Sequence, residues 1–136
     1  MITKPHYEAV MDGRTYRATR TQDPTVVNLR WSGSSPPDPR FTETVSGSYK
    51  LPVRLEELES LSLVEWRCEY DGEPFIVNDE DSDKLYVSYV GESETRAREL
   101  GMNIVERFVA DGELPKGAVE NLREVRKQYW PTPVQE

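Results

Sequence analysis

The sequence contains a single histidine, His6, and a single cysteine, Cys68, among 136 residues. One histidine supplies no paired-histidine zinc site and no conventional Ser-His-Asp triad. We expect His6 to be an exposed residue at the end of a strand. Cys68 has no partner for an internal disulfide and would need a nearby base to act as a nucleophile. Because it occupies an inward position of the strand pattern described below, we expect a buried thiol.

Long apolar runs are also lacking. The N-terminal residues MITKPHYEAV contain no stretch typical of a signal peptide or a membrane span, which, with the single cysteine, favours a cytoplasmic protein. The glycines are isolated and form no phosphate-binding loop, so no cofactor is expected. The 25 acidic residues are abundant, but nothing places two of them at a shared cleft. We therefore predict no catalytic residues.

Basic residues are outnumbered: 17 Lys and Arg stand against 25 Asp and Glu, for a formal charge of −8. Nucleic-acid binding takes most of its affinity from cations that neutralise phosphates, so this balance argues against a nucleic-acid partner. An acidic chain instead approaches a basic protein surface quickly. The charge is −1 over residues 1–65 and −7 over residues 66–136. We expect the second half to present a binding surface; the alternative is drift of solvated surface charge.

An internal similarity is the main positive feature. The segment YEAVMDGRTYRA, from Tyr7, aligns with WRCEYDGEPFIV, from Trp66, and their Asp-Gly pairs coincide. Asp-Gly is typical of two-residue hairpin turns, and the apolar residues at alternate positions on both sides predict strands. A third strand is predicted in each half, at 27–33 and 85–91. The alternative is that any two Asp-Gly hairpins align when gaps are allowed.

Beyond these strands the two halves differ. The first continues with SGSSPPDPR, which is rich in helix breakers, whereas the second continues with ESETRAREL, which has helical propensity and ends at Gly101. A fourth strand in each half could be supplied by Val45 and Tyr49, and by Ile104, Val105, Phe108 and Val109. Apolar spacing of three residues then predicts a short closing helix in each half, built on Val53, Leu58 and Leu61, and on Leu114, Val119 and Leu122, the second extending to Tyr129.

These patterns predict an α+β fold that is mainly antiparallel β. It consists of two tandem pseudo-repeats of three strands, a variable connection and a helix. The first repeat covers residues 1–65, the second covers 66–130 with its C-terminal helix, and 131–136 form an extended tail. A lone module of this size is only marginally stable, so we expect the repeats to form one compact unit.

One acidic cluster has the alternating carboxylates of a calcium-binding loop. It comprises Asp79, Glu80, Asp81 and Asp83. A calcium loop of the EF-hand type requires Gly at its sixth position and Glu at its twelfth, where this sequence has Lys84 and Val90. No metal site is therefore predicted. The cluster is either a solvated loop between the second and third strands or a patch that docks onto a cationic partner.

The pattern Y-x-A-x-x-x-G-x-x-Y-x-A in the first half, with C-E-Y-D-G-E-P-F-I-V and L-Y-V-S-Y-V-G in the second, resembles small bacterial proteins of unassigned function. In size, acidity and architecture the chain is also similar to immunity proteins that neutralise polymorphic toxins. This resemblance implies a compact, acidic, cytoplasmic protein without catalytic residues. It transfers no functional residue to this chain.

The leading hypothesis is a non-enzymatic protein-binding module, an immunity protein that occludes the active site of a basic toxin domain. The acidic cluster would pair with Lys or Arg of the toxin, and an exposed aromatic residue, Trp130, would anchor the contact. The alternative is an SH3-like β scaffold or peptide binder in which Tyr16, Trp31 and Tyr89 line a groove, although core burial explains those residues more simply. A third class, an enzyme that uses scattered carboxylates, is least favoured.

Overall fold

The computed structural model describes residues 2–106 and 109–132. Nine strand pairings among the described residues are antiparallel, which confirms the prediction of a mainly antiparallel β fold. The chain forms two compact units. Unit 1 comprises Met1–Pro5 and Glu65–Val125, and unit 2 comprises His6–Val64 and Arg126–Glu136. The division has a physical basis, because the buried apolar residues form two separate core clusters, one for each unit.

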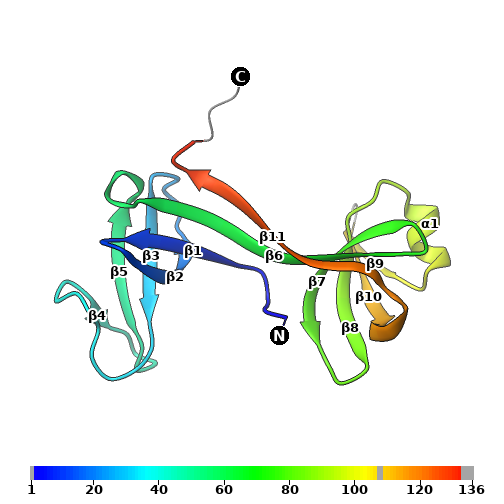
Figure 1. Cartoon of the computed structure of the whole chain (residues 1–136), viewed down its shortest axis with the longest axis horizontal. Helices are drawn as coiled ribbons and strands as arrows, with labels where there is room; N and C mark the ends of the chain where they lie inside the picture. Colours follow the sequence, from blue (N-terminus) through cyan, green and yellow to red (C-terminus); the bar gives the residue numbers. More distant parts are fainter. Residues whose placement is uncertain (1, 107–108, 133–136) are drawn as a thin grey trace. The chain divides into compact units, whose positions relative to one another are not determined.

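Unit 2 is an antiparallel sheet with the strand order β4-β5-β3-β2-β1-β6 (Figure 1). Its elements are β1 (His6–Met11), β2 (Arg14–Arg20), β3 (Val26–Trp31), β4 (Thr42–Glu43), β5 (Tyr49–Arg54), the 3₁₀ turn η1 (Leu55–Glu57) and the start of β6 (Ser60–Tyr70). The predicted hairpin between β1 and β2 is confirmed. Asp12 and Gly13 both have positive φ, at 52° and 76°, as a two-residue turn between twisted strands requires.

The core of unit 2 follows the alternation of its strands. Ala9 on β1 pairs with Tyr16 on β2, and Val27 and Leu29 follow at alternate positions of β3. Tyr16 is buried, and its ring centroid lies 5.7 Å from that of Phe41, which belongs to the long connection after β3. The predicted inward face of the first hairpin is therefore confirmed by burial.

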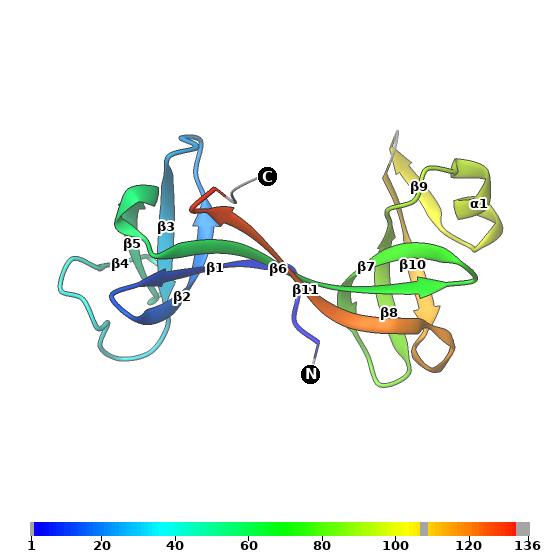
Figure 2. The same cartoon turned by 45° about the horizontal axis from the view of Figure 1, so that its top comes forward.

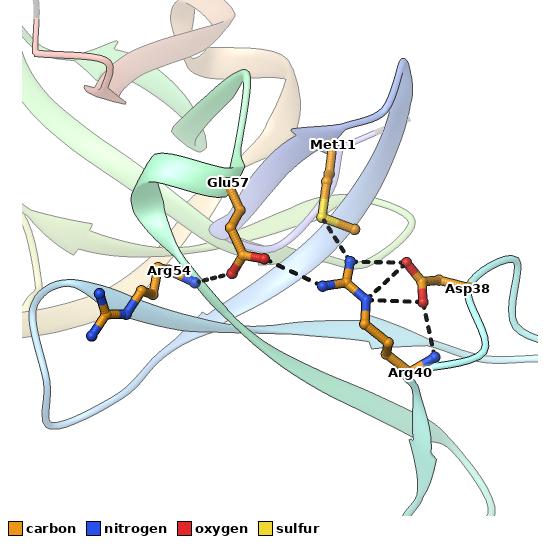
Figure 3. A network of polar contacts seen from close by, with 5 residues as sticks. All are labelled: Met11, Asp38, Arg40, Arg54 and Glu57. Atoms are coloured by element: carbon orange, nitrogen blue, oxygen red, sulfur yellow. Dashed lines mark hydrogen bonds and ion pairs between the residues drawn. The ribbon is translucent and has the colours of Figure 1, made fainter.

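The connection between β3 and β4 is held to this core by Arg40. Figure 3 shows its guanidinium between two carboxylates, with Nη2 3.0 Å from Asp38 Oδ2 and Nη1 3.2 Å from Glu57 Oε1. Glu57 also accepts a 2.8 Å hydrogen bond from the Arg54 backbone N–H, and Arg40 Nη2 reaches the Met11 sulfur at 3.9 Å. The hydrogen bonds from Arg40 hold the pKa of the Asp38 carboxyl below its ordinary value. One cation thus ties the connection to η1 and β1.

Unit 1 is an antiparallel sheet with the order β6-β7-β8-β10-β9, and β11 also pairs with β6. Its further elements are β7 (Glu73–Glu80), β8 (Lys84–Tyr89), the helix α1 (Glu94–Glu99), β9 (Asn103–Glu106), β10 (Val109–Pro115), the 3₁₀ turn η2 (Lys116–Ala118) and β11 (Glu120–Trp130). Strands β6 and β11 each contribute residues to both units. The second predicted hairpin is confirmed as well, since Asp71 and Gly72 have φ values of 51° and 80°.

The helical propensity of ESETRAREL is confirmed by α1. The Ser93 hydroxyl caps its first turn by accepting a hydrogen bond from the Arg96 backbone N–H at 3.1 Å. The chain leaves the helix through Gly101, whose φ of 84° lies in the left-handed region that favours glycine. Ala97 is the buried residue of α1 and packs into the core of unit 1.

Both predicted closing helices are wrong. In the first half, the apolar residues spaced by three are distributed over a strand, a 3₁₀ turn and a strand, because Val53 lies in β5, Leu58 follows η1 and Leu61 lies in β6. In the second half the helix expected to begin after Pro115 and to reach Tyr129 is for most of its length the strand β11. Only one turn, η2, has helical character in the place where that helix was expected to begin.

This segment forms the strand β11 instead of the predicted helix because its polar side chains have partners on neighbouring strands. Its apolar side chains form no buried stripe. No residue of β11 is fully buried, and Leu122 is 37% exposed. Arg123 Nη1 instead lies 2.8 Å from Glu69 Oε2 on β6, and Arg126 Nη1 lies 2.9 Å from Glu8 Oε1 on β1. Tertiary pairing outweighs the helical propensity of the segment.

His6 differs from its prediction. It begins β1 as expected, but its side chain is only 9% exposed and its Nε2 lies 2.8 Å from Glu8 Oε2. Cys68, by contrast, is buried in the core of unit 1, which confirms the expectation of an inward thiol. Burial also raises the pKa of this thiol, which disfavours the nucleophilic thiolate.

Glu8 should make unit 2 sensitive to acid. Burial alone would raise its pKa, but hydrogen bonds from His6 and Arg126 outweigh this effect, and the pKa is lowered. A carboxyl with a lowered pKa in the folded state stabilises the protein above the unfolded value, near 4.3, and the contribution is lost as the pH falls further. We expect Glu8→Gln to lower the free energy of unfolding by up to about 1 kcal/mol at pH 7, because the side chain is partly exposed.

Urea unfolding of Glu8→Gln and of the wild type at a series of pH values from neutral to acid checks this result. The difference between the two proteins should shrink as the pH falls through the folded pKa of Glu8. A difference that stays constant with pH would assign the effect to packing and contradict the electrostatic role.

Candidate functional site

A pocket of about 360 Å³ lies in unit 1 between the end of β8 and the elements that follow it. Figure 2 shows α1 beside β9, and these two elements supply Ala97 and Ile104 to the pocket. Strand β10 adds Val109 and Ala110. The volume is near the lower end of the range for small-ligand sites, roughly 300–1,000 Å³. The walls formed by these four side chains are apolar.

Tyr89, the last residue of β8, closes one side of the pocket. Its hydroxyl donates a 2.7 Å hydrogen bond to Glu73 Oε1 and accepts one from the Ser93 backbone N–H at 3.3 Å. Burial raises the pKa of Tyr89, and the hydrogen bond to Glu73 raises it further. The hydroxyl is therefore a fixed donor at neutral pH and a poor general base.

Gly91 is required by the position of the Tyr89 ring. A Cβ atom built on Gly91 would lie 2.2 Å from the Tyr89 hydroxyl oxygen and 2.4 Å from its Cζ. Both distances are far below van der Waals contact, so any other residue would displace the ring. Because Gly91 and Tyr89 both line the pocket, this close approach shapes it directly.

Two glutamates, Glu92 and Glu94, complete the lining. Glu94 Oε1 already accepts a 2.7 Å hydrogen bond from Arg98, one turn further along α1. Arg96 contacts Asp71 and lies 3.1 Å from Glu99. Within residues 2–106 and 109–132, the Glu92 side chain makes no hydrogen bond or ion pair. Among the described residues, the pocket thus combines apolar walls with one carboxylate that has no hydrogen-bond or ion-pair partner.

The acidic cluster predicted from the sequence lies at the other end of β8. Asp79 and Glu80 end β7, and the other two acids lie in the turn that leads into β8. Glu80 Oε2 lies 2.6 Å from Lys116 Nζ, and this contact lowers the pKa of Glu80. Asp79 Oδ2 lies 3.6 Å from Lys4 Nζ. The cluster and the pocket therefore occupy opposite ends of one strand.

Asp81 and Asp83 have different roles in the turn. Asp81 accepts a hydrogen bond from the Ser82 backbone N–H and another from the Tyr86 hydroxyl at 3.3 Å, and these bonds lower its pKa. Asp83 is exposed, and its carboxylate makes no hydrogen bond or ion pair in the part of the chain that the structure describes. Three of the four acids therefore have partners within unit 1.

Trp130 does not accompany the acidic cluster. It belongs to unit 2, where its indole Nε1 donates a 3.2 Å hydrogen bond to the Leu58 carbonyl oxygen. The side chain is partly buried against the core of that unit. The expectation of an exposed aromatic at this position is wrong, because its apolar rings complete a core and its N–H has a partner.

The three aromatic residues expected to line the groove of an SH3-like module also lie in different units. Tyr16 and Trp31 pack together in unit 2, with ring centroids 6.2 Å apart, whereas Tyr89 lines the pocket of unit 1. No single unit therefore contains the expected three-residue groove. Sequence reasoning did identify Tyr89, but it missed Glu92 and the apolar walls, because no motif marks residues that meet only through folding.

The net charge differs more between the two units than between the two halves of the sequence, which carry −1 and −7. Unit 1 contains 8 Lys and Arg against 16 Asp and Glu, whereas unit 2 contains 9 of each. The whole net charge of −8 thus belongs to unit 1, and unit 2 is neutral. The pocket and the acidic cluster both lie in the charged unit.

The described residues lack two features that would bear on function. Residues 2–106 and 109–132 contain no group of three or more His, Cys, Asp and Glu side chains placed to hold a metal ion. Across the same part of the chain, the structure has no helix that is long and apolar enough to cross a membrane.

Comparison with known proteins gives one match. Residues 4–130 fit a family described as "Uncharacterised conserved protein UCP033725", so the match covers nearly the whole chain, including both units. Neither the curated proteins nor the solved structures provide a significant match.

Proposed function

We propose that the chain, which belongs to this family of uncharacterised conserved proteins, is a non-enzymatic protein-binding module whose unit 1 binds a basic protein. The separation of charge carries the proposal. Unit 1 contains sixteen acidic residues and has a net charge of −8, whereas the acidic and basic residues of unit 2 balance. Charge concentrated on one unit directs a basic partner to that unit and accelerates the encounter.

The acidic cluster supports the first stage of this encounter. Asp83 is exposed, and its carboxylate makes no hydrogen bond or ion pair among the described residues. Asp79 accepts a local hydrogen bond from the Glu80 backbone N–H, and its carboxylate lies 3.6 Å from a well-exposed lysine. A cationic surface could replace that lysine at little cost, because exposed ion pairs contribute little to stability. Glu80 and Asp81 would instead maintain the turn through Lys116 and Ser82.

The specific form that we propose is an immunity protein located in the cytoplasm. Its unit 1 would cover the cationic active site of a toxin and block the toxin by occlusion. This form requires only a complementary surface on the immunity protein and no catalytic residue, cofactor or metal ion.

A second candidate is an SH3-like scaffold or peptide-binding module, and the pocket favours it. Tyr89 lines a small hollow with apolar walls, a feature suited to one side chain of a peptide. The two candidates share the binding surface and differ in the consequence of binding, which is toxin inhibition in one case and assembly in the other.

We also propose that the two units arose as tandem repeats. Each has an Asp-Gly hairpin, a third strand paired to it, two further strands, a 3₁₀ turn and a closing strand. The closing strands are β6 and β11, and the residues just before them, Leu58 and Val119, both follow a 3₁₀ turn. The common order of elements supports duplication more strongly than the sequence alignment does.

The test reverses charges in unit 1. We expect Asp79→Lys/Asp83→Lys to slow association with a basic partner by about tenfold at low salt, because the local attraction is lost. The full chain is used to capture proteins from its native cells, and the association rate of the purified partner is measured at low and high ionic strength. The wild-type rate should fall with salt, and the variant rate should depend less on salt.

The matched control changes the same charge in unit 2. Glu43→Lys/Glu56→Lys also replaces two exposed acids and should leave most of the association rate intact. A partner that binds both variants equally well, or the absence of any stoichiometric basic partner, overturns the proposal. Immunity and assembly are then distinguished by producing the partner alone: an immunity protein restores growth that the partner arrests.

A further inference from the structure

We propose that the pocket of unit 1 receives the side chain of a lysine or arginine from the protein partner. The inference rests on the proposed function and adds the anchoring contact that the acidic cluster does not provide. The pocket and the cluster lie at opposite ends of β8, so the anchor would be a separate contact from the one that steers association.

The apolar walls fit the stem of such a side chain. Ala97, Ile104 and Val109 surround a volume of about 360 Å³, which suits one long side chain better than a large ligand. Lysine and arginine bury their methylene stems against apolar surface and keep the cationic head at a polar boundary. Burial of the stem would thus cover Val109, which is 37% exposed.

The polar side of the pocket fits the cationic head. Glu92 lines the pocket and has no hydrogen-bond or ion-pair partner in the described part of the chain. An uncharged apolar occupant would remove water from this carboxylate without replacing its hydrogen bonds, which is costly. A cation would pair with the carboxylate, and the Tyr89 ring beside it adds an attractive surface for positive charge.

The negative charge of unit 1 also argues against an anionic occupant and against a second copy of the chain. A carboxylate or phosphate would meet Glu92 and the net charge of −8 on unit 1. A second copy of the chain carries the same net charge of −8, which opposes its approach. A basic protein is therefore the occupant that charge complementarity favours.

The experiment uses two small probes that differ only in the cation. Nα-acetyl-lysine methylamide carries the ammonium group, and Nα-acetyl-norleucine methylamide has the same apolar stem without it. Each is titrated into the full chain, and the backbone amide signals of Gly91, Ala97 and Ala110 are followed by NMR. We expect saturable shifts for the lysine probe with a Kd on the order of 1–10 mM, and binding of the norleucine probe about fivefold weaker.

Two variants separate the roles of charge and walls. Glu92→Gln should weaken the lysine probe by about fivefold and leave the norleucine probe unchanged, because only the ion pair is lost. Val109→Ser should weaken both probes, because it removes apolar surface from the wall. The matched control, Asp83→Asn, removes one charge from the same unit outside the pocket and should leave the lysine affinity within about twofold.

Several outcomes would overturn the inference. They are the absence of saturable shifts at the pocket, equal binding of the two probes, or an equal loss in Glu92→Gln and Asp83→Asn. Shifts that depend on protein concentration without any probe would assign the pocket to self-association instead. If these results were obtained while Asp79→Lys/Asp83→Lys still slowed partner association, the proposed function would stand and only the anchor would be lost.

Discussion

Phe75→Ala should lower the free energy of unfolding of unit 1 by about 3–5 kcal/mol. Phe75 lies on β7, is 0% exposed, and its ring centroid is 5.5 Å from that of Tyr89. Truncation removes the transfer free energy of the ring and leaves a cavity that the surrounding strands fill only in part. Domains are typically stable by about 5–15 kcal/mol, so this loss would bring unit 1 close to unfolding. It would also loosen Tyr89 and thus the pocket wall.

Urea unfolding followed by NMR amide signals measures this loss separately for each unit. The matched variant is Leu29→Ala, which creates a cavity in unit 2 at a residue that is also 0% exposed and should cost about 2–5 kcal/mol there. If each variant mainly affects the signals of its own unit, the two cores are energetically distinct. A loss below about 1 kcal/mol for Phe75→Ala would mean that the site collapses around the cavity, contrary to this expectation.

Gly91→Ala should lower the stability of unit 1 by about 2–4 kcal/mol. The added methyl group would lie 2.2 Å from the Tyr89 hydroxyl oxygen, so the ring must move. Its movement costs packing and breaks the 2.7 Å hydrogen bond to Glu73. The same displacement should reduce binding of the lysine probe, because Tyr89 lines the pocket.

Gly117→Ala is the control for a general effect of removing glycine. A Cβ atom on Gly117 would meet no other atom within 4 Å, so the substitution should change stability little or increase it slightly. Thermal and urea unfolding of the two variants provide the comparison. Equal stability of Gly91→Ala and Gly117→Ala would show that the Tyr89 ring adapts without loss, against the role assigned to Gly91.

The hairpins were predictable because their signals are local. Asp12-Gly13 and Asp71-Gly72 can adopt two successive positive φ values, and the alternating apolar residues beside them fix which face is buried. The helix α1 was also predictable, since ESETRAREL contains its cap, Ser93, and is followed by its terminating glycine, Gly101. In these segments the chemistry of a few neighbouring residues determines the structure.

Strand β11 was not predictable because its determinants are remote. Leu122 and Val125 have helical spacing, and the segment has helical propensity. The partners that favour a strand are Glu69 and Glu8, which precede β11 by more than fifty residues in the chain. Asn121 has a positive φ of 58°, which interrupts regular structure near the start of the strand. Only the assembled sheet brings these contacts together.

The candidate site was predictable only in its charge. The excess of acids in the second half is visible in composition, although the exact division, −8 for unit 1 and none for unit 2, depends on which terminal segments join each unit. Glu92 has no sequence signal, because its significance comes from lying beside Ile104 and Val109 without a partner among the described residues. Spatial proximity of this kind is created by the loop and strand connections, not by a motif.

The allocation of residues 126–130 to unit 2 has a consequence for synthesis on the ribosome. At about 5–20 residues per second, the 62 residues that follow Val64, up to Arg126, take roughly 3–12 s to add. During this interval the Leu58 carbonyl lacks the Trp130 indole and Glu8 lacks the Arg126 guanidinium. The half of the chain that is made first is therefore among the last to be completed, and a ribosome that pauses within β11 would hold it unfinished.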